Sequence, residues 1–299
     1  GQPKKVFRDL SHPYTKKLFS ASSEQFSFKE TNPSKEKLLE VRSVSVNYRS
    51  HERGIFSKGK SVEAVSNVSL DIRKGERLGL VGESGCGKST LTRTILGLQS
   101  ASSGYIKFDG KEVSKYDNNF KKNIQVVFQD PYGSFNPRQK IGRLITEPFF
   151  TLGREAPPET EQKIIAQKML KEVGLSSESI EKYIHEFSGG QRQRIAIARA
   201  LVIKPKLIIF DEAVSALDVS IRSQILKLIS DLTERYGLSY LFISHDLTVI
   251  ENITENCLVM KNGKIVERGQ TKHILRDPKN EYTLSLINAA PKFPNFLHA

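Results

Sequence analysis

The run Gly82-Glu83-Ser84-Gly85-Cys86-Gly87-Lys88-Ser89 fits the pattern G-x-x-x-x-G-K-[ST]. An apolar strand pattern over 77–81 precedes it, and a helical pattern opens at Thr90. Glycines let such a loop fold into a nest of backbone N–H donors, and the start of the helix adds partial positive charge. The run therefore predicts a phosphate-binding loop, with Lys88 reaching the β- and γ-phosphates and the Ser89 hydroxyl on Mg²⁺.

We expect the whole loop to contact a nucleotide. The predicted contacts are Gly82, Glu83, Ser84, Gly85, Cys86, Gly87, Lys88, Ser89 and Thr90. Cys86 is interpreted as a small filler rather than a nucleophile. The chain has two cysteines, Cys86 and Cys257. We interpret them as unpaired thiols in a reducing compartment, and two are too few for a four-cysteine metal or iron–sulfur site.

A second motif lies far along the chain, where the apolar run 207–210 ends in Asp211 and Glu212. A strand that ends in acidic residues is common, so the motif gains its meaning from the phosphate-binding loop. Asp211 is predicted to orient Mg²⁺ through its water shell, and Glu212 to act as general base on the attacking water. Together the two motifs predict ATP as the ligand and hydrolysis as the reaction.

The distribution of strand and helix patterns predicts an α/β fold. Strand patterns occupy 39–48, 62–72, 77–81, 207–210, 239–243 and 257–260, and helical patterns occupy 161–173, 191–202 and 219–235. Strands that alternate with helices indicate a parallel sheet with flanking helices.

The composition restricts the class of partner. The net charge is +13 over 299 residues, which fits a nucleic-acid partner, an anionic membrane surface or a solvated basic exterior. Lysines and arginines are spread along the chain without a basic cluster interleaved with aromatics. This distribution favours a diffuse solvated surface as the explanation of the positive charge. Proximity to a membrane ranks second, and a nucleic-acid partner ranks last. No run approaches the roughly 18 to 20 apolar residues of a membrane span.

The run Phe187-Ser188-Gly189-Gly190-Gln191 is similar to L-S-G-G-Q, the signature of the ATP-binding subunits of ABC transporters. Phe187 stands where the family has leucine. Ser188 suits a helix N-cap, and the two glycines let backbone N–H groups approach an anion. The competing interpretation is a plain glycine-rich cap on a surface helix.

The resemblance implies further roles for single residues. Gln129 resembles the Q-loop glutamine that senses Mg²⁺ and the attacking water, and His245 the switch histidine near the γ-phosphate. Tyr48 resembles the aromatic residue that stacks on adenine, with a cross-strand aromatic as the alternative. The implied contacts to nucleotide outside the loop are Tyr48, Ser188, Gly189, Gly190, Gln191 and the D-loop residue Asp218; the implied ligands of Mg²⁺ are Ser89, Gln129 and Asp211.

The resemblance covers residues 37–290 and implies a domain plan. A cassette over 37–268 is expected, with a RecA-like α/β core, an antiparallel β subdomain and a helical subdomain at about 130–186. Residues 269–299 are expected to form a C-terminal extension. Because residues 1–9 and 12–18 resemble 269–277 and 280–286, 1–20 is interpreted as the tail of a preceding cassette, and 21–36 as a linker. Chance similarity of two amphipathic helices is the alternative.

The runs 128–138 and 216–221 resemble the oligopeptide, dipeptide and nickel importers of the family. The implied function is an ATPase subunit that energises peptide import at the cytoplasmic face of the cell membrane. Import of nickel or another small solute, a soluble mechanical ABC ATPase and a regulatory module without hydrolysis remain alternatives. The implied partners are a second cassette, identical or homologous, stacked head to tail, transmembrane permease subunits and, indirectly, an extracytoplasmic solute-binding protein; nucleic acid is not expected.

Overall fold

The computed structural model describes residues 12, 33–49, 61–113 and 116–289. The predicted tail over 1–20, apart from residue 12, lies outside the described residues. So do most of the predicted linker 21–36 and residues 50–60.

The larger sheet has six strands in the order β10-β9-β3-β8-β7-β6. Its strands are β3 (Arg77–Val81), β6 (Ile124–Phe128), β7 (Leu207–Asp211), β8 (Ser239–Ser244), β9 (Asn256–Lys261) and β10 (Lys264–Gln270). Every residue of β3, β7 and β8 is buried, as expected for strands covered on both faces. The predicted parallel pairing holds from β9 to β6, whereas β10 runs antiparallel to β9.

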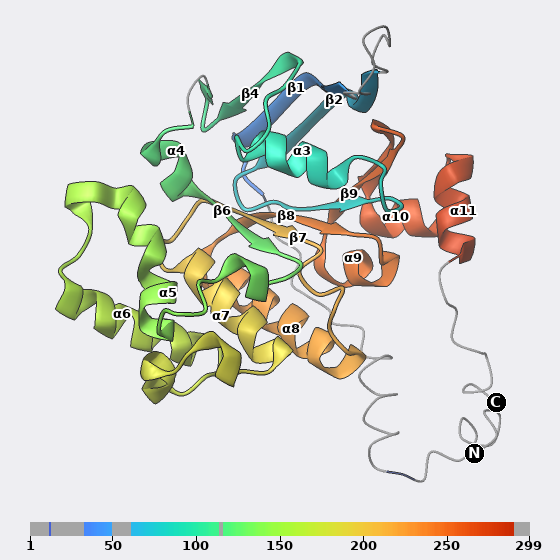
Figure 1. Cartoon of the computed structure of the whole chain (residues 1–299). Coiled ribbons are helices and arrows are strands. Elements are labelled where there is room, and N and C mark those ends of the chain that lie inside the picture. Colours follow the sequence, from blue (N-terminus) through green and yellow to red (C-terminus); the bar gives the residue numbers. More distant parts are fainter. Residues whose placement is uncertain (1–11, 13–32, 50–60, 114–115, 290–299) are drawn as a thin grey trace, which may run out of the picture.

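A second sheet has four antiparallel strands in the order β2-β1-β4-β5. It consists of β1 (Lys37–Arg49), β2 (Ser61–Arg73), β4 (Ser103–Phe108) and β5 (Lys111–Glu112). β1 and β2 pair antiparallel up to Arg49↔Ser61. Helix α3 (Lys88–Ile95) lies between the two sheets (Figure 1), and the apolar residues of both sheets form one core around it.

Helices cover the opposite face of the large sheet (Figure 1). These are α7 (Gly189–Leu201), α8 (Val219–Tyr236) and α9 (Leu247–Ile253). Between β6 and α7 the chain is helical, as predicted, in η1 (Tyr132–Ser134), α5 (Ile141–Thr146), η2 (Glu147–Glu155), α6 (Glu159–Glu172), η3 (Ser177–Glu181) and η4 (Ile184–Glu186). Ile164 belongs to the apolar spacing that predicts α6, yet it is 65% exposed.

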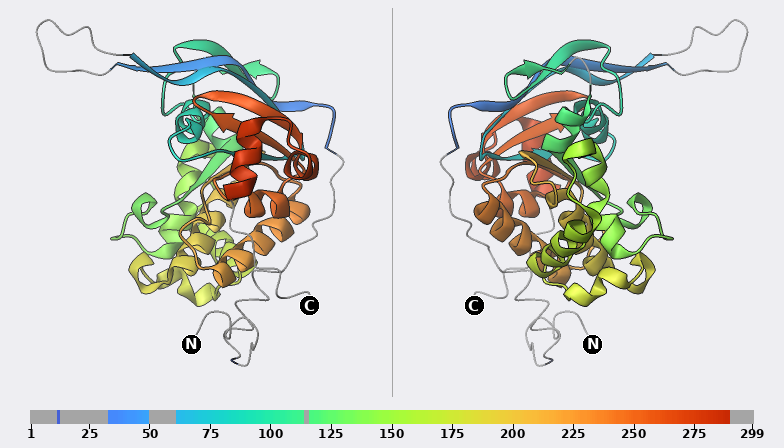
Figure 2. Two further views of the ribbon diagram at one scale, coloured as in Figure 1. Left: turned by 90° about the vertical axis from the view of Figure 1, so that its right-hand side faces the viewer. Right: turned by 90° about the vertical axis from the view of Figure 1, so that its left-hand side faces the viewer.

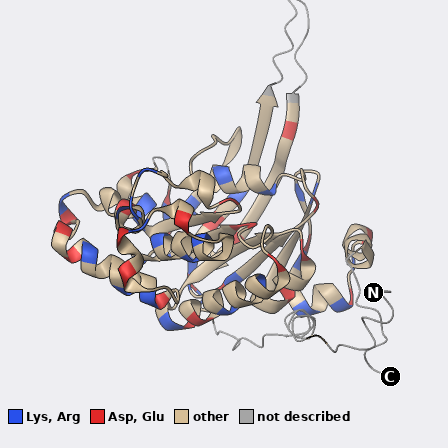
Figure 3. Ribbon diagram, turned by 60° about the horizontal axis from the view of Figure 1, so that its bottom comes forward, with Lys and Arg blue, Asp and Glu red and all other residues tan. Residues whose placement is uncertain are grey.

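The last described helices, α10 (Thr271–Arg276) and α11 (Glu281–Ala289), lie beside β9 and β10 (Figures 1 and 2). A short helix α4 (Asn118–Asn123) precedes β6. None of the helices in the described part of the chain is long and apolar enough to cross a membrane. Basic and acidic residues are interspersed over the elements in Figure 3, which agrees with the predicted diffuse charge.

Candidate active site

The predicted phosphate-binding loop connects β3 to α3, as the sequence indicates. Two of its glycines are required by close approaches of backbone. A Cβ at Gly82 would lie 2.3 Å from the Met260 carbonyl oxygen, and a Cβ at Gly87 would lie 2.4 Å from that of Ala64. Gly87 also has a φ of 110°, which L side chains rarely adopt. The loop is therefore enclosed by β2 and by the end of β9.

Cys86 lies in the loop and is 7% exposed. Burial raises the pKa of its thiol above the ordinary value. Burial also raises the pKa of the Cys257 thiol, to about 11. Both cysteines are unpaired. Two protonated, buried thiols agree with the predicted filler role of Cys86.

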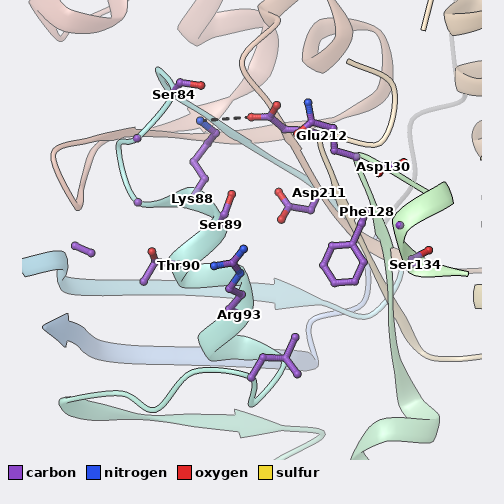
Figure 4. Close-up of a pocket in the computed structure, with 16 residues that line it drawn as sticks. Ser84, Lys88, Ser89, Thr90, Arg93, Phe128, Asp130, Ser134, Asp211 and Glu212 are labelled. Atoms are coloured by element: carbon purple, nitrogen blue, oxygen red, sulfur yellow. Dashed lines mark ion pairs between the residues drawn. The ribbon is translucent and has the colours of Figure 1, made fainter. Parts of the chain in front are cut away.

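Lys88 points into the loop and is 4% exposed. Its Nζ donates hydrogen bonds to the carbonyl oxygens of Gly82 at 2.7 Å and Glu83 at 2.9 Å. The same atom lies 4.0 Å from Glu212 Oε1, the ion pair drawn in Figure 4. The loop cation and the predicted general base thus face each other at the wall of one cavity.

Asp211 ends β7 and turns a buried carboxylate toward this cavity (Figure 4). Its Oδ1 has no hydrogen-bond partner among the described residues. Burial raises the pKa of Asp211, and the neighbouring charge of Glu212 adds to that effect. A buried oxygen without a partner is costly unless a cation or donor meets it.

The residues present fit the predicted Mg²⁺. The Ser89 hydroxyl lines the same cavity as Asp211, and Mg²⁺ prefers oxygen ligands of this kind. No cluster of three or more histidine, cysteine or acidic side chains suited to a metal occurs among the described residues. Ser89 and Asp211 would hold a Mg²⁺ at this place, and the ion usually completes its shell with phosphate oxygens and water.

Glu212 has an unusual backbone conformation, with a φ of 51°. Its N–H donates to the Ile243 carbonyl oxygen on β8 at 3.0 Å, and its own carbonyl accepts from the Ser215 hydroxyl at 2.9 Å. A left-handed conformation at a residue other than glycine is strained, and such residues gather at functional sites. His245 Nδ1 lies 3.3 Å from Glu212 Oε2. Two of the three predicted catalytic residues, Glu212 and His245, therefore form a pair, and the third, Gln129, lines the cavity.

The cavity has a volume of about 730 Å³. The sequence-predicted residues that line it are Ser84, Gly85, Gly87, Lys88, Ser89, Thr90, Gln129, Asp211 and Glu212. Sequence reasoning missed Ala64, Arg93, Leu98, Phe128, Asp130, Gly133 and Ser134. Arg93 follows Ser89 by four residues in a predicted helix, and this spacing could have placed it on the same face.

Four sets of predicted nucleotide contacts lie outside the lining, and the fourth is the signature-like run Ser188–Gln191. Gly82, Glu83 and Cys86 belong to the phosphate-binding loop, where Gly82 and Cys86 are buried and Glu83 is exposed. Tyr48, on β1, is 38% exposed and its hydroxyl lies 3.4 Å from the Thr90 hydroxyl, so it borders the loop without lining the cavity. Asp218 accepts a hydrogen bond from the Ile221 N–H and caps α8.

The signature-like run begins α7, and its serine is the N-cap, as predicted. The Gln191 N–H donates to Ser188 Oγ at 3.4 Å, and Gln191 Oε1 accepts from the Ser188 N–H at 3.0 Å. A Cβ at Gly190 would lie 2.5 Å from the Ile221 side chain, so glycine permits α7 to approach α8. Ser188, Gly189, Gly190 and Gln191 do not line the cavity of their own chain.

Comparisons with known proteins bear on this arrangement. A family model described as "ABC transporter" matches residues 65–215, and one described as "Oligopeptide/dipeptide transporter, C-terminal region" matches residues 266–296. The chain is 42% identical to the dipeptide transport ATP-binding protein DppF of Haemophilus influenzae, over 89% of this chain and 82% of that protein. It is 45% identical to the oligopeptide transport ATP-binding protein AppF of Bacillus subtilis, over 87% and 80%.

Two further matches differ in coverage. The glutathione import ATP-binding protein GsiA of Salmonella paratyphi A is 39% identical over 97% of this chain, which spans 51% of that protein. The solved ATP-binding cassette MJ0796, described as dimeric in a post-hydrolysis state with ADP and Pi, superposes with a TM-score of 0.69 at 27% identity. That match covers 78% of this chain and 99% of the cassette. Both the sequence and the fold matches carry the same assignment, and the chain belongs to the ABC transporter family.

Proposed function

We propose that this chain binds and hydrolyses ATP to energise an importer of peptides across the cytoplasmic membrane. The observation that carries the proposal is the meeting of Lys88, Asp211 and Glu212 at one cavity between two sheets. The names of the relatives DppF and AppF support peptides as the substrate class. The match of residues 266–296 to the C-terminal region of oligopeptide and dipeptide transporters supports it independently.

The residues predicted from the sequence divide the proposed reaction among them. The backbone N–H groups of the loop and Lys88 hold the phosphates. Ser89, Asp211 and Gln129 would hold Mg²⁺, which neutralises charge on the phosphates when it is bound. A water oxygen attacks the γ-phosphorus, the bond to the β–γ bridging oxygen breaks, and ADP and phosphate leave. Glu212 takes the proton from the water, and His245 orients Glu212 from 3.3 Å.

The signature residues complete the proposed site from a second cassette. Ser188–Gln191 lie at a helix start, where backbone N–H groups favour an anion, but away from the cavity of their own chain. A head-to-tail pair would place this helix start over the γ-phosphate of the other subunit, and Asp218 next to it. The dimeric state of the MJ0796 cassette supports such a pair. The likeness of 1–20 to 269–286 favours a homologous second cassette over an identical one.

The proposed complex includes transmembrane permease subunits and, through them, an extracytoplasmic solute-binding protein. The chain would lie on the cytoplasmic face as a peripheral subunit, with the helical residues 130–186 transmitting the motion of the cassette pair. The domain plan of the sequence analysis is part of this proposal. Its boundary at 268 falls inside β10, which runs to Gln270.

Substitution of Glu212 by glutamine tests the proposal. Glutamine keeps the shape of the side chain and cannot take the proton, so ATP hydrolysis in the assembled transporter should fall about 10²- to 10⁴-fold. Binding of Mg·ATP should persist, and ATP should accumulate in the complex. Phosphate release and retention of labelled ATP measure the two effects.

The matched control is Glu251→Gln, at an exposed position on α9, which should hydrolyse ATP at the unaltered rate. Undiminished hydrolysis by Glu212→Gln would remove Glu212 from its assigned role. Failure of the unaltered chain to bind Mg·ATP would overturn the proposed function itself. Copurification with membrane subunits, rather than with ribosomes or DNA, separates the importer from a mechanical ATPase.

A further inference from the structure

The side chain of Tyr282, in the first turn of α11, reaches the phosphate-binding loop. The Glu83 backbone N–H donates a hydrogen bond to the Tyr282 hydroxyl oxygen at 3.1 Å, across 199 positions of sequence. Tyr282 is 6% exposed, and the bond itself is partly buried. The C-terminal segment therefore contacts the backbone of the loop directly.

The Tyr282 ring is fixed by a second contact. Lys261 Nζ lies 4.5 Å from the ring centroid, a favourable cation–π distance. Lys261 is the last residue of β9, and β9 pairs with β3 through Val81↔Val259, immediately before the loop. The element that holds the ring thus runs beside the strand that feeds the loop.

The start of α11 is also tied to the large sheet. The Glu267 carboxylate, on β10, accepts hydrogen bonds from the N–H groups of Lys279 at 2.8 Å and Asn280 at 3.3 Å. Asn280 Oδ1 in turn accepts from the Tyr282 N–H at 2.9 Å. Hydrogen bonds to a charged acceptor are stronger than neutral ones. Tyr282 is therefore presented to the loop from a fixed helix start.

Within the loop, Glu83 is a branch point of the hydrogen-bond network. Its carbonyl oxygen accepts from Lys88 Nζ at 2.9 Å and from the Cys86 N–H at 3.3 Å. The Cys86 carbonyl accepts from the Gly263 N–H, in the β9–β10 turn, at 2.9 Å. Tyr282 fixes the peptide group that enters Glu83, and Lys88 and Cys86 fix the one that leaves it. The orientation of both peptide groups bears on where Lys88 lies.

We propose that Tyr282 is a positioning residue for the phosphate-binding loop, through which the C-terminal segment sets the affinity of the site for ATP. The inference rests on the proposed function, because it takes ATP as the ligand of the loop. Loss of one hydrogen bond that preorganises the loop should weaken ground-state binding more than the chemical step. The expected signature is a raised KM for ATP with kcat nearly unchanged.

The test compares Tyr282→Phe with Tyr105→Phe in the full chain. Phenylalanine removes only the hydroxyl and keeps the ring over Lys261. Tyr105 is a matched control, because it is 41% exposed and also has a lysine, Lys107, at its ring. We expect Tyr282→Phe to weaken Mg·ATP binding about three- to ten-fold and Tyr105→Phe to leave it unchanged. Amide hydrogen exchange at Glu83, measured without nucleotide, should become faster by a similar factor only in Tyr282→Phe.

A second variant, Glu267→Gln, keeps Tyr282 and removes the charge that holds the start of α11. Like Tyr282→Phe, it should weaken Mg·ATP binding and speed amide exchange at Glu83, but by a smaller factor. It keeps the test valid if Tyr282→Phe folds poorly. Unchanged affinity and unchanged Glu83 exchange in a folded Tyr282→Phe chain would overturn the inference. Because exchange is measured without nucleotide, absence of Mg·ATP binding in the unaltered chain would count against the proposed function alone.

Discussion

The imidazole of His245 meets the carboxylate of Glu212, with Nδ1 3.3 Å from Oε2. The two residues follow β8 and β7, which pair in parallel through Asp211↔Ile243. Parallel neighbours end at the same edge of a sheet, so residues 33 positions apart in sequence become a pair. The His245 side chain is 51% exposed and that of Glu212 only 14%. The histidine thus occupies the open side of the pair.

Replacement of His245 by alanine should remove this orienting contact. We expect ATP hydrolysis to fall about 100-fold, the cost of a base displaced by roughly 1 Å. Binding of Mg·ATP should change little, because His245 does not line the cavity. Phosphate release and equilibrium binding measure the two quantities. The exposed His273→Ala, on α10, is the control, and equal effects of both variants would contradict the prediction.

Asp211→Asn should stabilise the chain in the absence of nucleotide while it abolishes Mg²⁺-dependent turnover. Burial raises the pKa of Asp211, so the native state binds a proton more tightly than the unfolded state does. Ionisation of this carboxyl at pH values above its native pKa therefore costs native stability, and lowering the pH relieves that cost. A neutral amide removes it at every pH. We expect Tm at pH 7 to rise by about 2–4 °C, the shift for about 1 kcal/mol.

Calorimetry of the nucleotide-free protein at pH 7 checks this gain for Asp211→Asn. Asp231→Asn, at an exposed position on α8, should leave Tm unchanged. A lower Tm for Asp211→Asn would show that the carboxylate stabilises the fold. Retained Mg²⁺-dependent hydrolysis would show that Asp211 holds no metal.

Ser188→Ala should have two independent effects, a lower stability of the fold and a lower ATP turnover. Loss of an N-cap costs about 1 kcal/mol, so Tm should fall by about 2–4 °C. Ser176→Ala is a matched control, because Ser176 Oγ also accepts from a backbone N–H at a helix start, that of Glu178, at 3.2 Å. Both variants should lose similar stability. Only Ser188→Ala should lower ATP turnover of the assembled transporter, and Ser188→Thr should restore it. Equal ATP turnover in the two alanine variants would show that the start of α7 does not take part in hydrolysis.

Arg199→Lys tests the link between α7 and the edge of the cavity. Arg199 donates to the Ser134 carbonyl oxygen at 2.7 Å and to its hydroxyl at 2.8 Å, and its guanidinium lies 4.3 Å from the Phe135 ring centroid. Lysine keeps the charge but cannot reproduce a planar, two-pronged contact. We expect a loss of about 1–2 kcal/mol in the free energy of unfolding, measured in urea. The exposed Arg276→Lys should cost nothing measurable. If Arg199→Lys had the same free energy of unfolding as the unaltered chain, the two hydrogen bonds from Arg199 to Ser134 would not stabilise the fold.

Most of the large sheet could be predicted because its buried strands have a local sequence pattern. β3 and β7 are continuous apolar runs that end in a glycine loop and in two acids, and burial on both faces requires such runs. β10 could not be predicted in this way, since Lys264–Gln270 lies at the sheet edge with mostly polar residues. β6 joins β7, and through this pairing the segment Phe128–Ser134 lines the cavity. Apart from Gln129, which the family resemblance indicated, the sequence gives no sign of that placement.

The site was predictable where chemistry requires a fixed local pattern, as in the loop and in Asp211–Glu212. It was not predictable where contacts depend on the packing of distant elements. The hydrogen bond from Glu83 to Tyr282 joins residues 199 positions apart, and no periodicity carries such information. Tyr282 stood out only as part of a family-like tail. The pairing of Arg199 with Ser134 could not be predicted for the same reason.

The left-handed backbone at Glu212 has a consequence for protein engineering. Glycine or asparagine at position 212 would relieve the backbone strain, just as asparagine at position 211 would remove the cost of the buried carboxylate. A screen for thermal stability alone would accordingly enrich substitutions at positions 211 and 212 and select stable proteins that do not hydrolyse ATP. Directed evolution of this chain needs a selection on turnover from the first round.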